Sequence, residues 1–398
     1  MKRIKNMNAH LTLRSLAATS FLALAVTSAC GLAGCGTDPD AADPNGTEDE
    51  LSAKPPQYVL LAFDGSYANA FWQESRDFAK SAARAGKPVK FTYFINASYY
   101  VPRPGNQAYF PPKHRQGASA IGWGDDDADV AKRIAHTNAA FEEGHEIGSH
   151  TVGHWDGSTW SAAEWDSEFD QFDKLLFETN HPGAPAWKFG PEASVGFRAP
   201  QLGFSTGLYP TLVEHGYIYD TSKSNVSSYW PQKQNGVWNM PLAELRIVGN
   251  TKKALSMDYN FYMAHSKGLP DAANKATYKK QMYDTYMAYF DANYNGNRAP
   301  LHIGHHFSKW NGGAYWEAMQ EFALAVCGKP NVKCSTYKEF TDFLNSRTAQ
   351  QLADYKNRAF LPAGDTDSAE GELIGDEAAA HDEEAEGAEP EGTDTTEE

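Results

Sequence analysis

The segment EIGSHTVGHWDG, residues 146–157, carries two histidines four residues apart, His150 and His154. In a helical or turn-like backbone this spacing lets both imidazoles point the same way, as metal ligands do. Thr151 follows the first histidine, so the metalloprotease motif HExxH is excluded. The spacing alone fits either a metal site or a pair of hydrogen-bonded histidines.

The other reactive side chains stand where short apolar runs end. Between about residues 57 and 347, β-rich apolar runs alternate with longer amphipathic ones, which predicts βα units and a largely parallel sheet. In a parallel barrel the carboxyl ends of the strands meet on one face, which carries the active site. We therefore expect one shared site. The residues at the predicted strand ends are Asp64, His150, Arg198, Asp220, His305 and His306.

Two capping boxes mark helix starts within this region. Ser161 stands three residues before Glu164, and Thr336 stands three residues before Glu339. In each pair the hydroxyl and the carboxylate can satisfy free backbone N–H groups of the first helical turn. We expect helices to begin after Ser161 and after Thr336.

Five motifs resemble those of the polysaccharide deacetylases, carbohydrate esterase family four, over about residues 58–344. They occur in the family's order, and the His-Thr-x-x-His motif after a Glu-Ile-Gly-Ser strand is the most specific of them. The resemblance implies an α/β fold, a distorted (β/α) barrel, for a catalytic domain of residues 57–347. The motifs are AFDGS at 62–66, SHTVGH at 149–154, FRAP at 197–200, GYIYD at 216–220 and HIGHHF at 302–307.

The resemblance also implies a metal centre. His150 and His154 fall on the family's ligands for a divalent metal, usually zinc, whose third ligand is an aspartate. Such a metal lowers the pKa of a bound water towards about 7 and polarises the carbonyl of an acetamide. The implied activity is metal-dependent hydrolysis of N-acetyl groups on a glycan such as peptidoglycan, a chitin-like oligomer or an exopolysaccharide.

The acid and base roles follow from the same resemblance. Asp64 falls on the family's general base and Arg198 on the arginine that orients it, while a late histidine is the general acid. For the acid, the expected strand register favours His305, with His306 next and His302 third.

The chain departs from the family at the third metal ligand. The family usually has two adjacent aspartates, base then ligand, but Gly65 follows Asp64. Asp64 could itself bind the metal, Asp156 could replace the missing ligand, or a water could fill the position. A poorer candidate is an acidic cluster that is more typical of a solvated loop and helix start. It comprises Asp125, Asp126, Asp127 and Asp129.

Flat rings beside the proposed site could stack on sugar faces. Trp155 follows the second histidine of the pair and Trp310 follows the last motif, while Pro200 ends the FRAP motif. These three are the predicted substrate-binding residues, although most of the ten tryptophans should fill interfaces between helices and the barrel.

Two other functions remain open. Gly65 is compatible with a catalytically decayed lipoprotein that binds carbohydrate on the same scaffold. A glycosidase with Asp64 and Asp220 as paired carboxylates would leave the histidines without a role.

The amino-terminal residues are typical of an exported bacterial lipoprotein of the cell envelope. Residues 1–34 combine basic residues, a short apolar run and Leu-Ala-Gly before Cys35, which resembles a lipobox whose cysteine is lipidated. Residues 35–56 are polar and acidic, as in a disordered tether. An ordinary secreted protein is the alternative. In either case Cys327 and Cys334 could form a small disulfide.

The carboxyl-terminal extension, residues 348–398, ends in an acidic tail. From Gly364 onward it holds fifteen Asp and Glu residues and neither Lys nor Arg. The formal net charge of −16 therefore resides almost entirely in this tail. We expect the tail to be disordered and solvated, and we do not expect nucleic acid as a partner.

Replacing Cys35 with serine should release the protein from membranes, because serine offers no thiol for a lipid anchor. Acetate release from an N-acetylated glycan should be unchanged in the released protein. Cell fractionation measures the first effect, and finding the variant still in the membrane fraction would indicate a different anchor.

Overall fold

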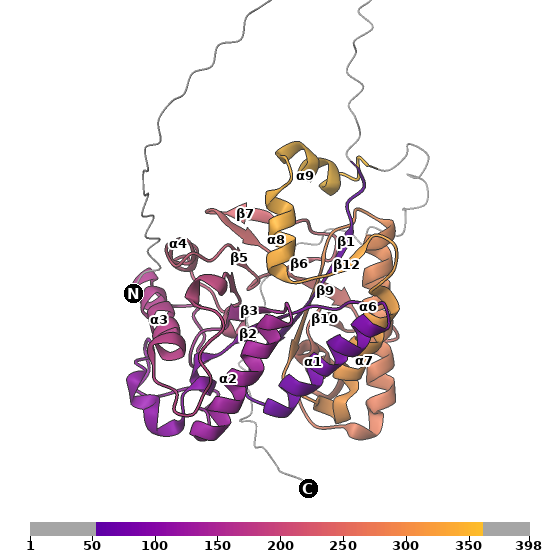
Figure 1. The fold of residues 1–398 in the computed structure, drawn as a ribbon. Helices are drawn as coiled ribbons and strands as arrows, with labels where there is room; N and C mark the ends of the chain where they lie inside the picture. Colours follow the sequence, from indigo (N-terminus) through magenta and orange to yellow (C-terminus); the bar gives the residue numbers. More distant parts are fainter. Residues whose placement is uncertain (1–52, 361–398) are drawn as a thin grey trace, which may run out of the picture. The chain divides into compact units, whose positions relative to one another are not determined.

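A computed structural model describes residues 53–360 of the chain (Figure 1). The predicted signal peptide, Cys35, most of the tether and the acidic tail lie outside this range. Within residues 53–360, no helix is both long enough and apolar enough to cross a membrane.

The largest element is a sheet of nine strands. These are β1 (Gln57–Asp64), β2 (Phe91–Ile95), β3 (Glu146–Ser149), β4 (Gly196–Phe197), β5 (Tyr219–Asp220), β7 (Gln232–Gln234), β8 (Val237–Asn239), β11 (Leu301–His306) and β12 (Val332–Cys334). The order is β11-β1-β2-β3-β4-β5-β8-β7, and β12 pairs with the start of β1. All pairs are parallel except β7 with β8, so the predicted parallel sheet is confirmed.

A second sheet joins the first. Its strands are β10 (Lys253–Leu255), β9 (Leu242–Arg246) and β6 (Ser224–Val226), in that order. The segment after β10 reaches β11, where Gly304 N donates to the carbonyl of Ser256 at 2.9 Å. On the other side, Leu242 N donates to the carbonyl of Lys223, just beyond β5. The sheet thus curls into the expected distorted (β/α) barrel, which is confirmed.

Helices cover the barrel and one end of it. The α-helices are α1 (Asn69–Arg84), α2 (Asp127–Glu142), α3 (Ala162–Asp173), α4 (Leu208–Glu214), α5 (Asp258–Ser266), α6 (Lys275–Asn295), α7 (Trp310–Val326), α8 (Tyr337–Asn345) and α9 (Ala349–Lys356). Short 3₁₀ helices lie at Ala97–Tyr100, Arg103–Ala108, Pro191–Ala193, Pro200–Leu202 and Ala272–Asn274, and a π-helical turn extends α3 over Lys174–Glu178. Figure 1 shows α1, α6 and α7 together on the outside of the sheet.

The side chains of β1 alternate between two apolar environments. Val59, Leu61 and Phe63 belong to the large core that the sheet forms with the outer helices. Tyr58 and Leu60 point to the opposite face, where Tyr58 packs on Phe340 of α8 with ring centroids 4.7 Å apart. The two-residue period of a strand therefore directs Asp64, the last residue of β1, to the face that carries Tyr58 and Leu60, which is the interior face of the barrel.

Both predicted capping boxes are present. Ser161 and Glu164 exchange hydrogen bonds at the start of α3, and Thr336 and Glu339 do so at the start of α8. The predicted disulfide between Cys327 and Cys334 also forms, and it connects the end of α7 to β12.

Candidate active site

Arg198 connects the two most reactive groups at the carboxyl ends of the strands. Its guanidinium donates from Nη1 to Oδ1 of Asp64 at 2.7 Å, and the side chains of the pair are 0% and 4% exposed. Its backbone carbonyl lies 2.7 Å from Nδ1 of His150. A carbonyl can only accept, so Nδ1 carries the proton and Nε2 keeps the lone pair that a metal needs. Burial lowers the pKa of His150 to about 3, which leaves the ring neutral.

His154 reaches His150 through a turn, not a helix. Thr151 and His154 have φ of 62° and 59°, in the left-handed region that β-branched residues rarely adopt. The turn brings the two ring centroids to 4.9 Å from each other. The predicted pair of histidines is therefore assembled at the end of β3.

A buried carboxylate holds this turn in place. Oε1 of Glu168, on α3, accepts from the backbone N of Val152 at 2.9 Å, and both carboxylate oxygens lie within 3.0 Å of the hydroxyl of Tyr109. Glu168 is 0% exposed, and burial raises its pKa to about 7. Its position explains how a strained backbone persists between the two histidines.

Neither Asp156 nor the acidic cluster is placed as the third metal ligand in residues 53–360. The carboxylate of Asp156 accepts from N and Oγ of Ser158 at 2.8 and 2.9 Å, within its own turn. The acidic cluster forms a loop and helix start, as favoured above, where Asp126 caps α2 and Asp129 pairs with Arg133. Within residues 53–360, no three His, Cys, Asp or Glu side chains are grouped to hold a metal ion.

The residues that could hold a metal here are the two imidazoles of His150 and His154, whose ring centroids lie 4.9 Å apart. The remaining candidate from the protein is Asp64, whose negative charge acts on His150 but which is already paired with Arg198. Gly65, at the family's ligand position, has φ of 78° and open space where a side chain would begin.

The late histidines lie on different faces of β11. His306 is paired in register with Asp64 of β1, and it shares the interior face with that residue. His305 points to the opposite face, where Nε2 lies 3.3 Å from the hydroxyl of Tyr286. His302 is buried deeper in the interior, with its ring stacked on that of Tyr337. Two-residue alternation from Asp64 favours His306, while Nδ1 of His305 also lies 3.6 Å from Oδ2 of Asp258.

Asp258, which the sequence did not indicate, orients His306. It is the first residue of α5, and its Oδ1 lies 2.6 Å from Nδ1 of His306 while Oδ2 accepts from the backbone N of His306 at 2.9 Å. Burial opposes ionisation of Asp258, but the charges of His306 and His305 and the hydrogen bonds from His306 outweigh it and lower its pKa. His306 is 21% exposed, so it can reach a ligand while it is held.

The three predicted substrate-binding residues differ in how far neighbouring residues cover their rings. Trp310 lies beside His306 at 5.3 Å between ring centroids and stacks on Tyr262. One face of Trp155 is covered by His114, whose ring is parallel at 3.6 Å. Pro200 is buried at the start of a 3₁₀ turn, so its ring offers no surface to a sugar.

The carboxylate of Asp220 is not paired with that of Asp64. Its carboxylate accepts from the hydroxyl of Tyr209 at 2.9 Å and from N of Ser222 at 3.1 Å, and it is fully buried. The two carboxylates are thus engaged with separate partners, an arrangement that does not favour the paired-carboxylate glycosidase.

Sequence reasoning missed Glu168 and Asp258 for different reasons. Glu168 lies on the apolar side of α3 together with Trp165, Phe169 and Phe172. A carboxylate within an apolar stripe requires buried partners, and this was a usable signal. Asp258 carries no such signal, since an acidic residue in a first helical turn is ordinary.

No family model matches the chain, and no curated protein matches it. Solved structures do resemble it. A Mycobacterium smegmatis protein provisionally assigned as a polysaccharide deacetylase shares 14% identity at a TM-score of 0.44, over 75% of this chain and 96% of that one. The chitin deacetylase of Colletotrichum lindemuthianum shares 15% at 0.38, over 70% and 85%.

A third similar structure is a CE4 family pseudoenzyme from Bacillus anthracis. It shares 10% identity at a TM-score of 0.39, over 72% of this chain and 66% of that one. All three TM-scores are below 0.5, so these likenesses carry no conclusion about the chemistry of this chain.

Replacing Glu168 with glutamine should alter how stability depends on pH. Because the folded pKa is raised to about 7 from 4.5, ionisation of Glu168 opposes folding as pH rises through this window. Wild type should lose roughly 3 kcal/mol relative to the variant between about pH 4 and 8. Denaturant unfolding of metal-free protein at several pH values measures this.

The exposed Glu142 on α2 provides the control, since Glu142→Gln removes a carboxylate that is not enclosed. Its stability should follow the wild-type pH profile. A Glu168→Gln profile that also runs parallel to wild type would show that Glu168 is not held as described.

Proposed function

We propose that this protein is a hydrolase that removes acetyl groups from an N-acetylated glycan with the help of a divalent metal such as zinc. The observation that carries the proposal is the double role of Arg198, whose guanidinium holds Asp64 and whose carbonyl holds His150. His306 lies on the same interior face and is oriented by Asp258. These contacts support a proposed base, a proposed pair of metal ligands and a proposed acid in one region of the barrel.

His150 and His154 would hold the metal, which would supply a polarised acetyl carbonyl and a water with lowered pKa. Asp64, fixed by Arg198, would accept the proton of the attacking water. His306, held by Asp258, would donate a proton to the departing amine. Trp310, beside His306, would pack against the sugar that carries the amine.

The proposed location is the cell envelope, where Cys35 would anchor the protein through a lipid. The basic start, the short apolar run and the Leu-Ala-Gly-Cys sequence support it. Peptidoglycan, chitin-like oligomers and exopolysaccharides are the N-acetylated polymers that such an enzyme could meet.

A second candidate is a carbohydrate-binding lipoprotein without catalytic activity. The observation in its favour is Gly65, which stands where the resembled family has the aspartate that binds the metal. Sugar binding without metal and without acetate release would support this candidate.

Replacing His150 with alanine should abolish stoichiometric binding of zinc or cobalt and reduce acetate release by at least about 10²-fold, because one of two protein imidazoles is removed. If Asp64 acts only as the base, Asp64→Asn should still bind the metal, and its acetate release should fall by a similar factor. His181→Ala, which changes a histidine in the loop after α3, is the control and should affect neither. Wild-type protein that binds no metal and releases no acetate from any glycan would refute the proposal.

Replacing Gly65 with aspartate should tighten metal binding, because it restores a carboxylate where the family has one. The φ of 78° costs aspartate about 1 kcal/mol of stability, and no atom lies within 4 Å of the new Cβ. Calorimetric titration with zinc, alongside Gly65→Ala as the control for backbone strain, measures the gain. Equal affinity in the two variants would mean that this position does not face the metal.

A further inference from the structure

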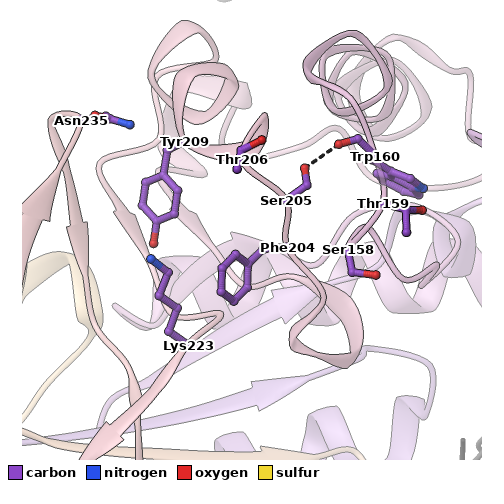
Figure 2. A pocket seen from close by; sticks show the side chains of 9 residues that line it. All are labelled: Ser158, Thr159, Trp160, Phe204, Ser205, Thr206, Tyr209, Lys223 and Asn235. Atoms are coloured by element: carbon purple, nitrogen blue, oxygen red, sulfur yellow. Dashed lines mark hydrogen bonds between the residues drawn. The ribbon is translucent and has the colours of Figure 1, made fainter. Parts of the chain in front are cut away.

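A pocket of about 750 Å³ opens beside the loops that carry the proposed catalytic residues (Figure 2). One wall, Ser158–Trp160, follows His154 in the chain, and another, Phe204–Thr206, follows Arg198. The two loops are in contact, because a Cβ added at Gly203 would lie 1.8 Å from Oδ1 of Asp156. Two walls of the pocket are therefore formed by loops that directly follow His154 and Arg198 of the candidate site.

The walls of this pocket are fixed by partly buried hydrogen bonds. Oγ of Ser205 donates to the carbonyl of Trp160 at 2.5 Å, a contact drawn in Figure 2, and accepts from Nε1 of Trp165 at 2.9 Å. Trp165 is fully buried in α3. Because these walls are already ordered, little conformational entropy is lost when a ligand binds.

Lys223 is the one charged side chain among the residues that line the pocket. Its Nζ lies 4.5 Å from the ring centroid of Tyr209 and 5.1 Å from that of Phe204, and it donates to Oε1 of Gln234 at 2.6 Å. These contacts hold the ammonium in place, and an ammonium has three N–H donors, so donors remain for a ligand. Figure 2 shows Lys223 directed towards Tyr209 and Phe204.

The nearby carboxylate does not take these donors. Asp220 is 0% exposed and is occupied by Ser222 and by the hydroxyl of Tyr209. The charge of Asp220 acts on Lys223, but its oxygens are taken by these other donors, so N–H groups of Lys223 remain for a ligand. A ligand that fits this arrangement brings one negative charge.

The remaining lining suits a sugar. Phe204 is 39% exposed, so an apolar ring face is available for stacking. Ser158, Thr206 and Asn235 contribute hydroxyl and amide groups that can bond to sugar hydroxyls. An aromatic face, neutral polar groups and one cation together match a sugar ring that bears a carboxylate.

We propose that this pocket is a second glycan subsite that binds a carboxylate-bearing sugar of the same polymer whose acetyl group enters the catalytic site. The inference rests on the proposed function for the role of the catalytic site, but the binding it describes does not require catalysis. It makes Lys223 a specificity-determining residue and Phe204 its stacking platform.

The test measures binding by calorimetry with two oligosaccharides of equal length. One alternates N-acetylated sugars with sugars that carry a carboxylate, and in the other each carboxylate is converted to an amide. Lys223→Met should weaken binding of the acidic oligosaccharide on the order of tenfold and leave the amidated one nearly unchanged, because only the former loses a charge-assisted bond. Lys223→Arg should retain most of the affinity.

Lys233→Met is the matched control. Lys233 also lies over an aromatic ring, at 5.0 Å from that of Trp238, but it does not line this pocket. It should leave both affinities unchanged. Equal losses for the two oligosaccharides in Lys223→Met, or no loss, would overturn the proposal, and a loss in Phe204→Ala alone would indicate a neutral-sugar subsite.

Acetate release, measured in parallel, separates this inference from the proposed function. Lys223-dependent binding without acetate release would support the subsite and refute the hydrolase. Acetate release that is equal on both oligosaccharides and insensitive to Lys223→Met would support the hydrolase and refute the subsite.

Discussion

The buried ion pair of Arg198 with Asp64 constrains the whole sheet. Asp64 ends β1 and Arg198 directly follows β4. Because β2 and β3 lie between these two strands, a flat sheet would place them about 14 Å apart. Curling of the sheet brings the guanidinium within 2.7 Å of the carboxylate, and removing one partner of such a pair typically costs about 3–5 kcal/mol. The same guanidinium approaches β11 so closely that a Cβ at Gly304 would lie 3.1 Å from Nη1. Curvature and charge pairing therefore depend on each other.

The order of strands and helices was predictable because each signal is local. The apolar run that ends at Asp64 and the capping boxes at Ser161 and Thr336 depend on residues a few positions apart, and all of them are confirmed. Even β4 and β5, two residues each, end where the polar residues Arg198 and Asp220 predict. The small sheet of β6, β9 and β10 was not anticipated, since short strands with exposed residues show little periodicity.

The site was predictable where a residue type and a strand end coincide, and unpredictable where register or tertiary contact decides. Asp64, Arg198 and His150 converge as expected. The choice between His305 and His306 required the register of β11 against β1, which no local pattern contains. Asp258 is brought to His306 from 48 residues away in the chain, so its role depends on how α5 packs against β11.

Three buried carboxylates lie at the candidate site, and each has different partners. Asp258 contacts histidines that can become cationic, and its pKa falls despite burial. Glu168 contacts a tyrosine hydroxyl and a backbone N–H, which stabilise its anion too weakly to offset burial, so its pKa rises to about 7. Asp64 is matched by the permanent cation of Arg198. The proposed base is thus matched by a permanent opposite charge, whereas the support of a strained turn needs only hydrogen-bond acceptors.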